Sequence, residues 1–163
     1  MTDGSAEFEG GFPDSPSHSG WRRLRSPPMR KVQAMALNPR DWAIKFAEAS
    51  DSDATIGAMA RYFTCTYLLD MKDAKVIVEM IDGKVYRVNI DPQPMDAFDF
   101  ALRASAETWR EFARPVPRPM YHGIWSASFR RDLSIEGNTL VLMQNLRNFT
   151  VQFELLRKVG VPV

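Results

Sequence analysis

The sequence contains few of the residues that build enzyme and metal sites. Among 163 residues there is one cysteine, Cys65, and there are two histidines, His18 and His122. One cysteine cannot form an internal disulfide or a cysteine-rich zinc site. His122 and scattered carboxylates supply too few ligands for a metal. We therefore expect neither a metal nor a cofactor.

Recognisable catalytic motifs are also missing. The sequence has no Gly-x-Ser-x-Gly nucleophile elbow, and its glycines form neither a phosphate-binding loop nor a dinucleotide fingerprint. We assign no catalytic residue and expect a protein that is not an enzyme. A small hydrolase or isomerase that uses His122 is the weakest alternative, because a lone histidine is more typical of a hydrogen-bonded or surface position.

No charge of one sign dominates, and no long hydrophobic run occurs. Lys and Arg total 21 against 20 for Asp and Glu, which disfavours specific nucleic-acid binding through a basic surface. No stretch approaches the ~20 apolar residues of a membrane span, and the N-terminus has no apolar signal segment. We expect a soluble, cytoplasmic protein with at most transient membrane contact.

Composition divides the chain into residues 1–38 and residues 39–163. The first part holds four glycines and four prolines without apolar periodicity, which predicts a flexible tail. Its basic stretch from Trp21 to Arg25 is typical of a solvated leader, and an anchor for anionic lipid or nucleic acid is the alternative. Hydrophobic residues make up 45% of the chain, enough for the second part to form one domain with a core.

Helices and strands are both predicted in the first half of the domain. Asn38-Pro39 is typical of a helix start, and helical apolar spacing over residues 56–71 predicts a second helix, unless a strand begins near Cys65. Alternating residues on both sides of Asp82-Gly83 predict a tight hairpin of residues 75–81 and 84–90. Residues 97–104 predict a third strand. Its residues on one face are Phe98, Phe100 and Leu102. Such alternation is typical of a sheet covered on one side only.

The second half begins with a short helix capped by Ser105 and a proline-rich extended connection. A helix is predicted over residues 120–130, a short strand over 133–137, and a long helix with one apolar stripe over 142–156. In the helix predicted over residues 120–130, the inward residues are Tyr121, Ile124, Trp125 and Phe129. Consecutive antiparallel strands with helices gathered on one face describe an α+β layer.

The order of these segments resembles the sterol carrier protein type-2 family of lipid-transfer domains. The matching segments, within about residues 40–160, are residues 76–90, 98–109 and 133–138, together with the last helix. The resemblance implies a single mostly antiparallel, five-stranded sheet with helices on one face and an apolar tunnel between them. It also implies carriage of fatty acyl chains, sterols or similar lipids without covalent chemistry. Asn138 stands where the family commonly has Asp, so a generic acyl ligand is favoured over a sterol.

The leading hypothesis is non-enzymatic binding of an apolar ligand between the sheet and the helices. Tyr121 and His122 are candidates to orient the polar end of this ligand. The residues expected to line the pocket are Phe98, Phe100, Leu102, Trp109, Phe112, Tyr121, Ile124, Trp125, Phe129, Leu142, Leu146 and Phe149. On the pattern alone, a solid core in which these side chains fill the space is favoured, and the cavity is the alternative. The alternative function is an accessory subunit whose exposed apolar helix face docks on a second copy or on a partner enzyme.

Overall fold

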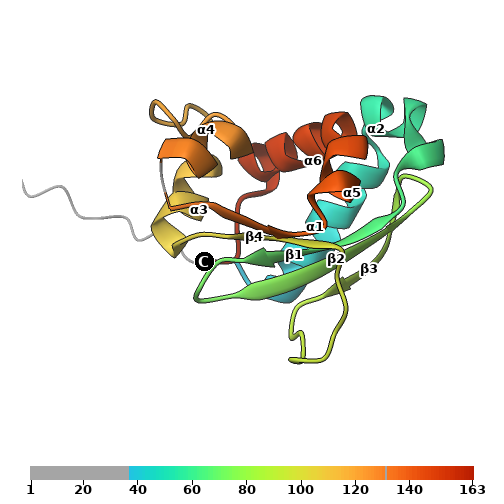
Figure 1. The fold of residues 1–163 in the computed structure, drawn as a ribbon, viewed down its shortest axis with the longest axis horizontal. Coiled ribbons are helices and arrows are strands. Elements are labelled where there is room, and N and C mark those ends of the chain that lie inside the picture. The colour runs from blue at the N-terminus through green and yellow to red at the C-terminus, as the bar shows by residue number, and fades with distance from the viewer. Residues whose placement is uncertain (1–36, 131) are drawn as a thin grey trace, which may run out of the picture. The chain divides into compact units, whose positions relative to one another are not determined.

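The computed structural model describes residues 37–130 and 132–163. The basic stretch near Trp21 and His18 lie outside the described residues, so the expected tail stays a prediction. In the described part a single sheet carries helices on one face, and one long connection lies on the other (Figure 1).

The sheet has five strands in the order β3-β2-β1-β4-β5. The strands are β1 (Cys65–Asp70), β2 (Lys75–Ile81), β3 (Lys84–Asn89), β4 (Phe100–Arg103) and β5 (Ser134–Gly137). Every neighbouring pair is antiparallel except β1 and β4, which are parallel. The predicted α+β class and the mostly antiparallel five-stranded sheet are confirmed. The predicted hairpin pairs antiparallel, but the predicted third strand does not continue it, because β4 pairs with β1 in parallel and not with β3.

The hairpin of β2 and β3 forms as the sequence predicts. Asp82 and Gly83 have φ values of 48° and 76°, the left-handed conformation that a tight two-residue turn requires. Gly83 is needed for a second reason, because a Cβ atom there would lie 2.5 Å from the Cα of Ala60. The turn is thereby held against the segment that precedes β1.

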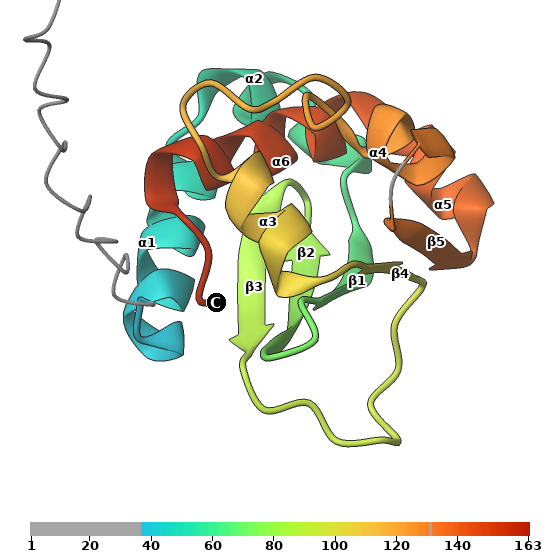
Figure 2. The same cartoon turned by 90° about the vertical axis from the view of Figure 1, so that its left-hand side faces the viewer.

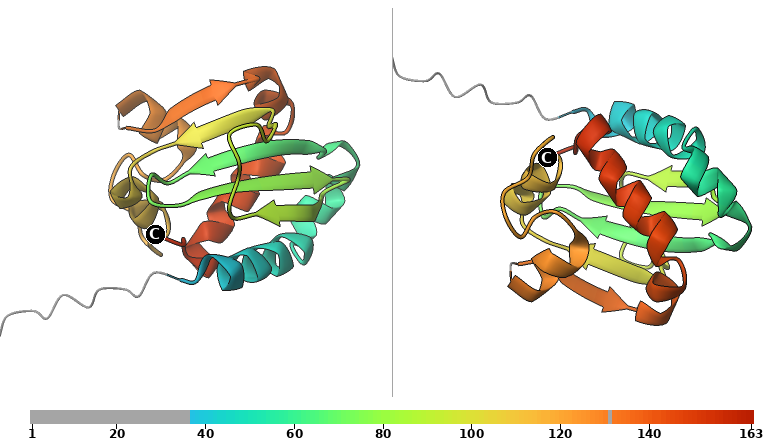
Figure 3. Two further views of the ribbon diagram at one scale, coloured as in Figure 1. Left: turned by 90° about the horizontal axis from the view of Figure 1, so that it is seen from below. Right: turned by 90° about the horizontal axis from the view of Figure 1, so that it is seen from above.

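The helices cover one face of the sheet, and α6 runs diagonally across it (Figure 3). Two helix starts that the sequence predicts are confirmed: Asn38 accepts a hydrogen bond from the backbone N–H of Arg40, and Ser105 accepts one from that of Thr108. The helices are α1 (Pro39–Asp51), α2 (Ala54–Ala58), the 3-10 helix η1 (Ala60–Tyr62), α3 (Ala106–Phe112), α4 (Ile124–Arg130), α5 (Thr139–Gln144) and α6 (Leu146–Val159).

Three predicted helices differ from those observed. The segment 56–71 becomes α2, η1 and then β1, which begins at Cys65. The long C-terminal helix is divided at Asn145, whose backbone has φ −105° and ψ 11° and so departs from helical geometry. The helix predicted over 120–130 starts only at Ile124, since Met120 has a φ of 76°.

The main core lies between the helices and the sheet. Trp42 of α1 and Trp109 of α3 are fully buried, and their indole N–H groups donate to the carbonyls of Gly160 and Asp70 at 2.8 and 3.0 Å. Both tryptophans therefore bury a large apolar surface without leaving a donor unpaired. The core thus connects α1, α3 and the chain after α6 to the sheet.

A second, small cluster of buried residues lies apart from the main core and consists of Leu68, Ile77 and Ala101. These residues alternate along their strands with side chains of the main core, so they point to the helix-free face. The prediction of a sheet covered on one side only is wrong at this place. Residues 90–99, here called the arch, link β3 to β4 and cross the helix-free face (Figure 3).

Candidate functional site

The site that the sequence predicts is the interior between the sheet and the helices. Its centre is a group of three rings. Tyr67 of β1 and Phe100 of β4 are register partners with stacked rings 5.6 Å apart. The ring of Phe149 of α6 meets both edge-on, at 5.1 and 5.4 Å. The parallel pairing of β1 and β4 therefore brings together two rings that lie far apart in the sequence.

The aromatic contacts continue from this centre toward α3 and the connection after it. Phe153, one helical turn beyond Phe149, contacts Phe112 at 4.9 Å and Trp109 at 6.1 Å between ring centroids. Phe112 in turn contacts Tyr121 at 5.8 Å. The result is a continuous apolar and aromatic layer that links the middle of the sheet to the connection between α3 and α4.

Side chains fill this interior almost completely. The void at its centre has a volume of about 10 Å³, about the space of one water molecule. It is lined by Phe46, Tyr67, Leu69, Phe149, Gln152, Phe153 and Leu156. Among the described residues, this void is too small to be the tunnel that the family resemblance implies. A ligand of acyl size enters only if side chains or a helix move.

A polar network crosses the wall of the void. The hydroxyl of Tyr67 donates to Oε1 of Gln152 at 2.6 Å, and Nε2 of Gln152 donates to Oγ of Ser50 at 2.9 Å. Burial, with a smaller contribution from Cys65, raises the pKa of Tyr67 well above its ordinary value, so the phenol stays protonated. Nε2 of Gln152 also donates to Sδ of Met80 at 3.2 Å, so the donors of Tyr67 and Gln152 are engaged and their oxygens remain as neutral acceptors for the polar end of a buried ligand.

The structure shows no catalytic arrangement around the residues that the sequence singled out. Burial, and secondarily Asp99, raises the pKa of the Cys65 thiol to about 12, so this cysteine is not a thiolate nucleophile at neutral pH. His122 is exposed, and its carbonyl accepts a hydrogen bond from Arg157 at 2.7 Å. Among the described residues no group of three or more His, Cys, Asp or Glu is placed to hold a metal. None of the helices described is long and apolar enough to cross a membrane.

Most of the predicted lining residues do lie in or against the core. The buried ones are Phe100, Leu102, Trp109, Phe112, Ile124, Leu142 and Phe149. The partly buried ones are Tyr121, Trp125 and Leu146. Two predicted orientations are wrong. Phe129 is 79% exposed on the outside of α4, and Phe98 lies before β4 on the helix-free face, beside Leu68 and Ile77. Whether the inward residues bind a ligand stays a prediction.

Five apolar or aromatic side chains at the void were not among the predicted lining residues although they carry a signal. Phe46 shares a helix face with Trp42, and Phe153 and Leu156 continue the stripe of Phe149. The other two, Tyr67 and Leu69, lie in an apolar segment whose spacing left helix and strand open. Gln152 carries no such signal, because a polar residue within an amphipathic helix is expected on the solvent face.

The proline-rich connection between α3 and α4 forms a wide loop at the outside of the helix layer (Figure 2). It is held by Glu111 of α3, which is 5% exposed. The carboxylate of Glu111 accepts a hydrogen bond from the backbone N–H of Arg118 at 2.8 Å. It also forms ion pairs with Arg114 at 3.1 Å and Arg118 at 3.3 Å. We call this group the Glu111 latch.

Comparison with known proteins identifies the fold. No family model and no curated protein sequence matches this chain. Among solved structures, it matches a crystal structure of sterol carrier protein 2 with a TM-score of 0.59 and 16% identity, over 74% of this chain and 96% of that one. It also matches a conserved hypothetical protein of Thermus thermophilus, described as possibly a sterol carrier protein, with a TM-score of 0.57 and 16% identity, over 74% and 87%.

This chain is an α+β protein with an aromatic interior between one sheet and its helices. The fold of this chain is that of sterol carrier protein 2, as the sequence resemblance predicts.

Proposed function

We propose that this protein binds and carries an apolar ligand, such as a fatty acyl chain, between its sheet and its helices without covalent chemistry. The observation that carries the proposal is the sterol carrier protein 2 fold, with an aromatic layer at the place where that fold brings sheet and helices together. The group that meets the polar end of the ligand is the pair of Tyr67 and Gln152, because both lie at the void. This pair replaces His122, which is exposed.

The energetics allow such binding despite the closed interior. Enclosing roughly 300 Å² of apolar ligand surface contributes about 7 kcal/mol before the costs of association. The free energy needed to open the interior is subtracted from this amount, because only the open fraction of the molecules can bind the ligand. An opening cost of about 2 kcal/mol weakens binding by about 30-fold. We therefore expect a carrier of moderate affinity that releases its ligand readily.

The first experiment is native mass spectrometry of the gently purified full chain, followed by organic extraction and lipid analysis. A near-stoichiometric apolar ligand supports the proposal and gives the ligand class. A ligand-free mass, together with no binding of a fluorescent fatty acid such as dansyl-undecanoic acid, contradicts it.

A pair of variants tests the location of the bound ligand. Phe153→Ala removes a ring from the wall of the void and lowers the cost of opening, so it is expected to increase the affinity for the fluorescent fatty acid. Phe63→Ala is the matched control, because Phe63 is fully buried in the core but does not line the void. Equal affinities of both variants and the parent chain would place any binding elsewhere.

A further inference from the structure

The helix-free face of the sheet carries an unexpected apolar row. Leu68 of β1 is the register partner of Ile77 of β2 and of Ala101 of β4, so the three side chains lie side by side. Leu68 and Ile77 are each 5% exposed and Ala101 is fully buried, although no helix within the described residues covers this face. The arch covers them, because the strand order forces the chain to cross β2 and β1 on its way from β3 to β4.

The arch covers this row without filling the space above it. A pocket of about 290 Å³ remains, with Leu68 and Ile77 as its floor and Phe98 and Pro94 among its walls. This volume is far larger than the void of about 10 Å³ in the interior. It lies at the lower limit of the roughly 300–1,000 Å³ typical of small-molecule sites. The pocket is therefore suited to a small molecule and not to a long acyl chain.

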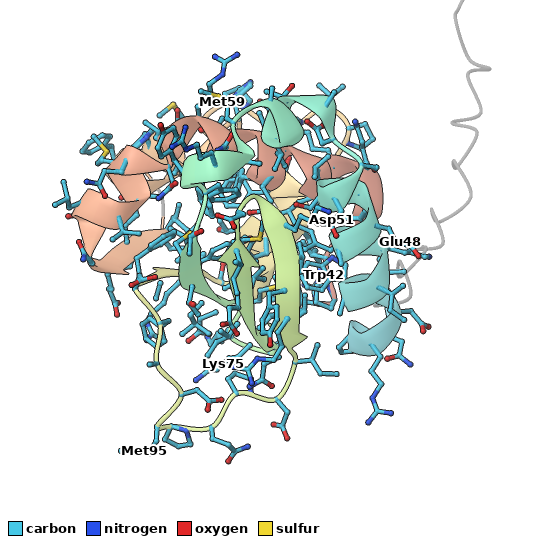
Figure 4. The ribbon with its side chains drawn as sticks, turned by 90° about the vertical axis from the view of Figure 1, so that its right-hand side faces the viewer. Trp42, Glu48, Asp51, Met59, Lys75 and Met95 are labelled. Atoms are coloured by element: carbon cyan, nitrogen blue, oxygen red, sulfur yellow. The ribbon has the colours of Figure 1, made fainter. Side chains whose placement is uncertain are left out.

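The arch is held in shape by the side chain of Asp96. Its carboxylate accepts hydrogen bonds from Nδ2 of Asn89 and from the backbone N–H of Gln93, both at 2.9 Å. The backbone N–H of Asp96 donates back to the carbonyl of Gln93 at 3.0 Å. Figure 4 shows Met95 at the far end of the arch and Lys75 between the arch and the sheet. A site fixed in this way is preformed, so ligand binding does not have to order the loop.

Two cations, Lys75 and Arg103, and one carboxylate, that of Asp96, line the pocket. The Asp96 carboxylate is engaged within the arch, and the two cations differ in how their charge is used. Arg103 is paired on both sides, with Asp70 at 2.6 Å and with Glu136 at 2.8 Å. Lys75 has only a 3.6 Å ion pair with the same Asp70 carboxylate, and its side chain is 54% exposed. Since Asp70 is engaged closely by Arg103, the ammonium group of Lys75 is the one placed to accept a further anionic partner.

We propose that the pocket under the arch is a second ligand site, and that its ligand is a small carboxylate with an apolar, aromatic-sized body. The body lies on Leu68 and Ile77 beside the ring of Phe98, and the carboxylate pairs with the ammonium group of Lys75. This site lies on the opposite face of the sheet from the interior, so it is independent of the carrier function proposed above.

The test is a titration of the full chain with hydrocinnamate, followed by amide chemical shifts. Hydrocinnamyl alcohol, which has the same apolar body without the charge, is the control ligand. We expect saturable shifts at Leu68, Ile77 and Phe98, with the alcohol binding more weakly by about fivefold. Shifts confined to the helix layer, equal affinity for the alcohol, or no saturation at millimolar concentration would each overturn the proposal.

Matched variants separate the roles of charge and ring. Lys75→Met is expected to weaken hydrocinnamate binding by about fivefold and to leave the binding of the alcohol unchanged. Lys84→Met is the control, because Lys84 is exposed at the start of β3 and does not line the pocket. Phe98→Ala is expected to weaken both ligands. If Lys75→Met and Lys84→Met bind hydrocinnamate equally, Lys75 is not the carboxylate partner.

Discussion

The Glu111 latch gives a prediction whose size follows from the contacts. Glu111→Ala removes the buried carboxylate that accepts the hydrogen bond of the Arg118 backbone N–H, and a hydrogen bond to a charged group contributes about 1.5–3 kcal/mol. The two ion pairs add little, because Arg114 and Arg118 are 54% and 62% exposed. We expect a loss of about 2 kcal/mol in the free energy of unfolding. At ~2–4 °C per kcal/mol for a chain of this size, Tm falls by about 4–8 °C.

Glu111→Gln separates the hydrogen bond from the charge. The amide oxygen still accepts from Arg118, so only the weak ion pairs are lost, and the expected cost is below about 1 kcal/mol. Scanning calorimetry measures both variants, and amide hydrogen exchange at Arg118 reports on the latch itself. Exchange at this amide is expected to accelerate strongly in Glu111→Ala and weakly in Glu111→Gln.

Two results would refute this reasoning. If both variants lose the same stability, the charge and not the acceptor holds the connection. If Glu111→Ala lowers Tm but leaves exchange at Arg118 unchanged, the stability loss has another origin. Repeating the melts at high salt adds an independent check, because screening weakens the exposed ion pairs and leaves the hydrogen bond intact.

Three further predictions follow from single residues. Gly137→Ala places a Cβ atom 2.6 Å from the carbonyl oxygen of Asp99 at a φ of +89°, so chemical denaturation should show a loss of about 1–3 kcal/mol. Burial alone would raise the pKa of Asp132, but hydrogen bonds from Thr108 and Ser105 outweigh burial and lower this pKa. The stability that this carboxylate contributes is therefore present above the unfolded pKa of about 3.9 and is lost as pH falls through the folded pKa. In Asp132→Asn, the free energy of unfolding should fall less steeply with pH in this acid range. Cys65 should resist a thiol reagent at pH 8 in the folded chain and react fully in denaturant, because its thiol is buried with a pKa of about 12.

The sequence predicts those parts of the fold that depend on neighbouring residues. The Asp82-Gly83 turn and the helix cap at Ser105 are local chemistry, and both form as expected. The alternative that a strand begins near Cys65 is confirmed, and the helical spacing that favoured a helix through Tyr67 continues into β1 by coincidence. Phe129 was misplaced because its ring stacks on Trp125 at 6.5 Å on the outside of α4, a contact that spacing alone does not distinguish from burial.

The candidate sites were less predictable than the elements, because both depend on how distant segments meet. The sequence left open whether the aromatic residues enclose a cavity or fill a core, and only the ring contacts of Phe149 and Phe153 decide that the interior is closed here. The pocket under the arch requires the strand order, since no local pattern indicates that residues 90–99 cross β1 and β2.

The strand order also has a consequence for the course of folding. The β1-β2-β3 meander pairs residues that are close in sequence. Pairing of β1 with β4 must instead close a long loop: Thr66 and Asp99, which meet there, are 33 residues apart. Closing a long loop costs chain entropy before the contacts between its ends can compensate. The meander is therefore expected to form first, and β4 to pair with β1 late in folding. Substitutions in the arch should then accelerate unfolding while leaving the refolding rate nearly unchanged.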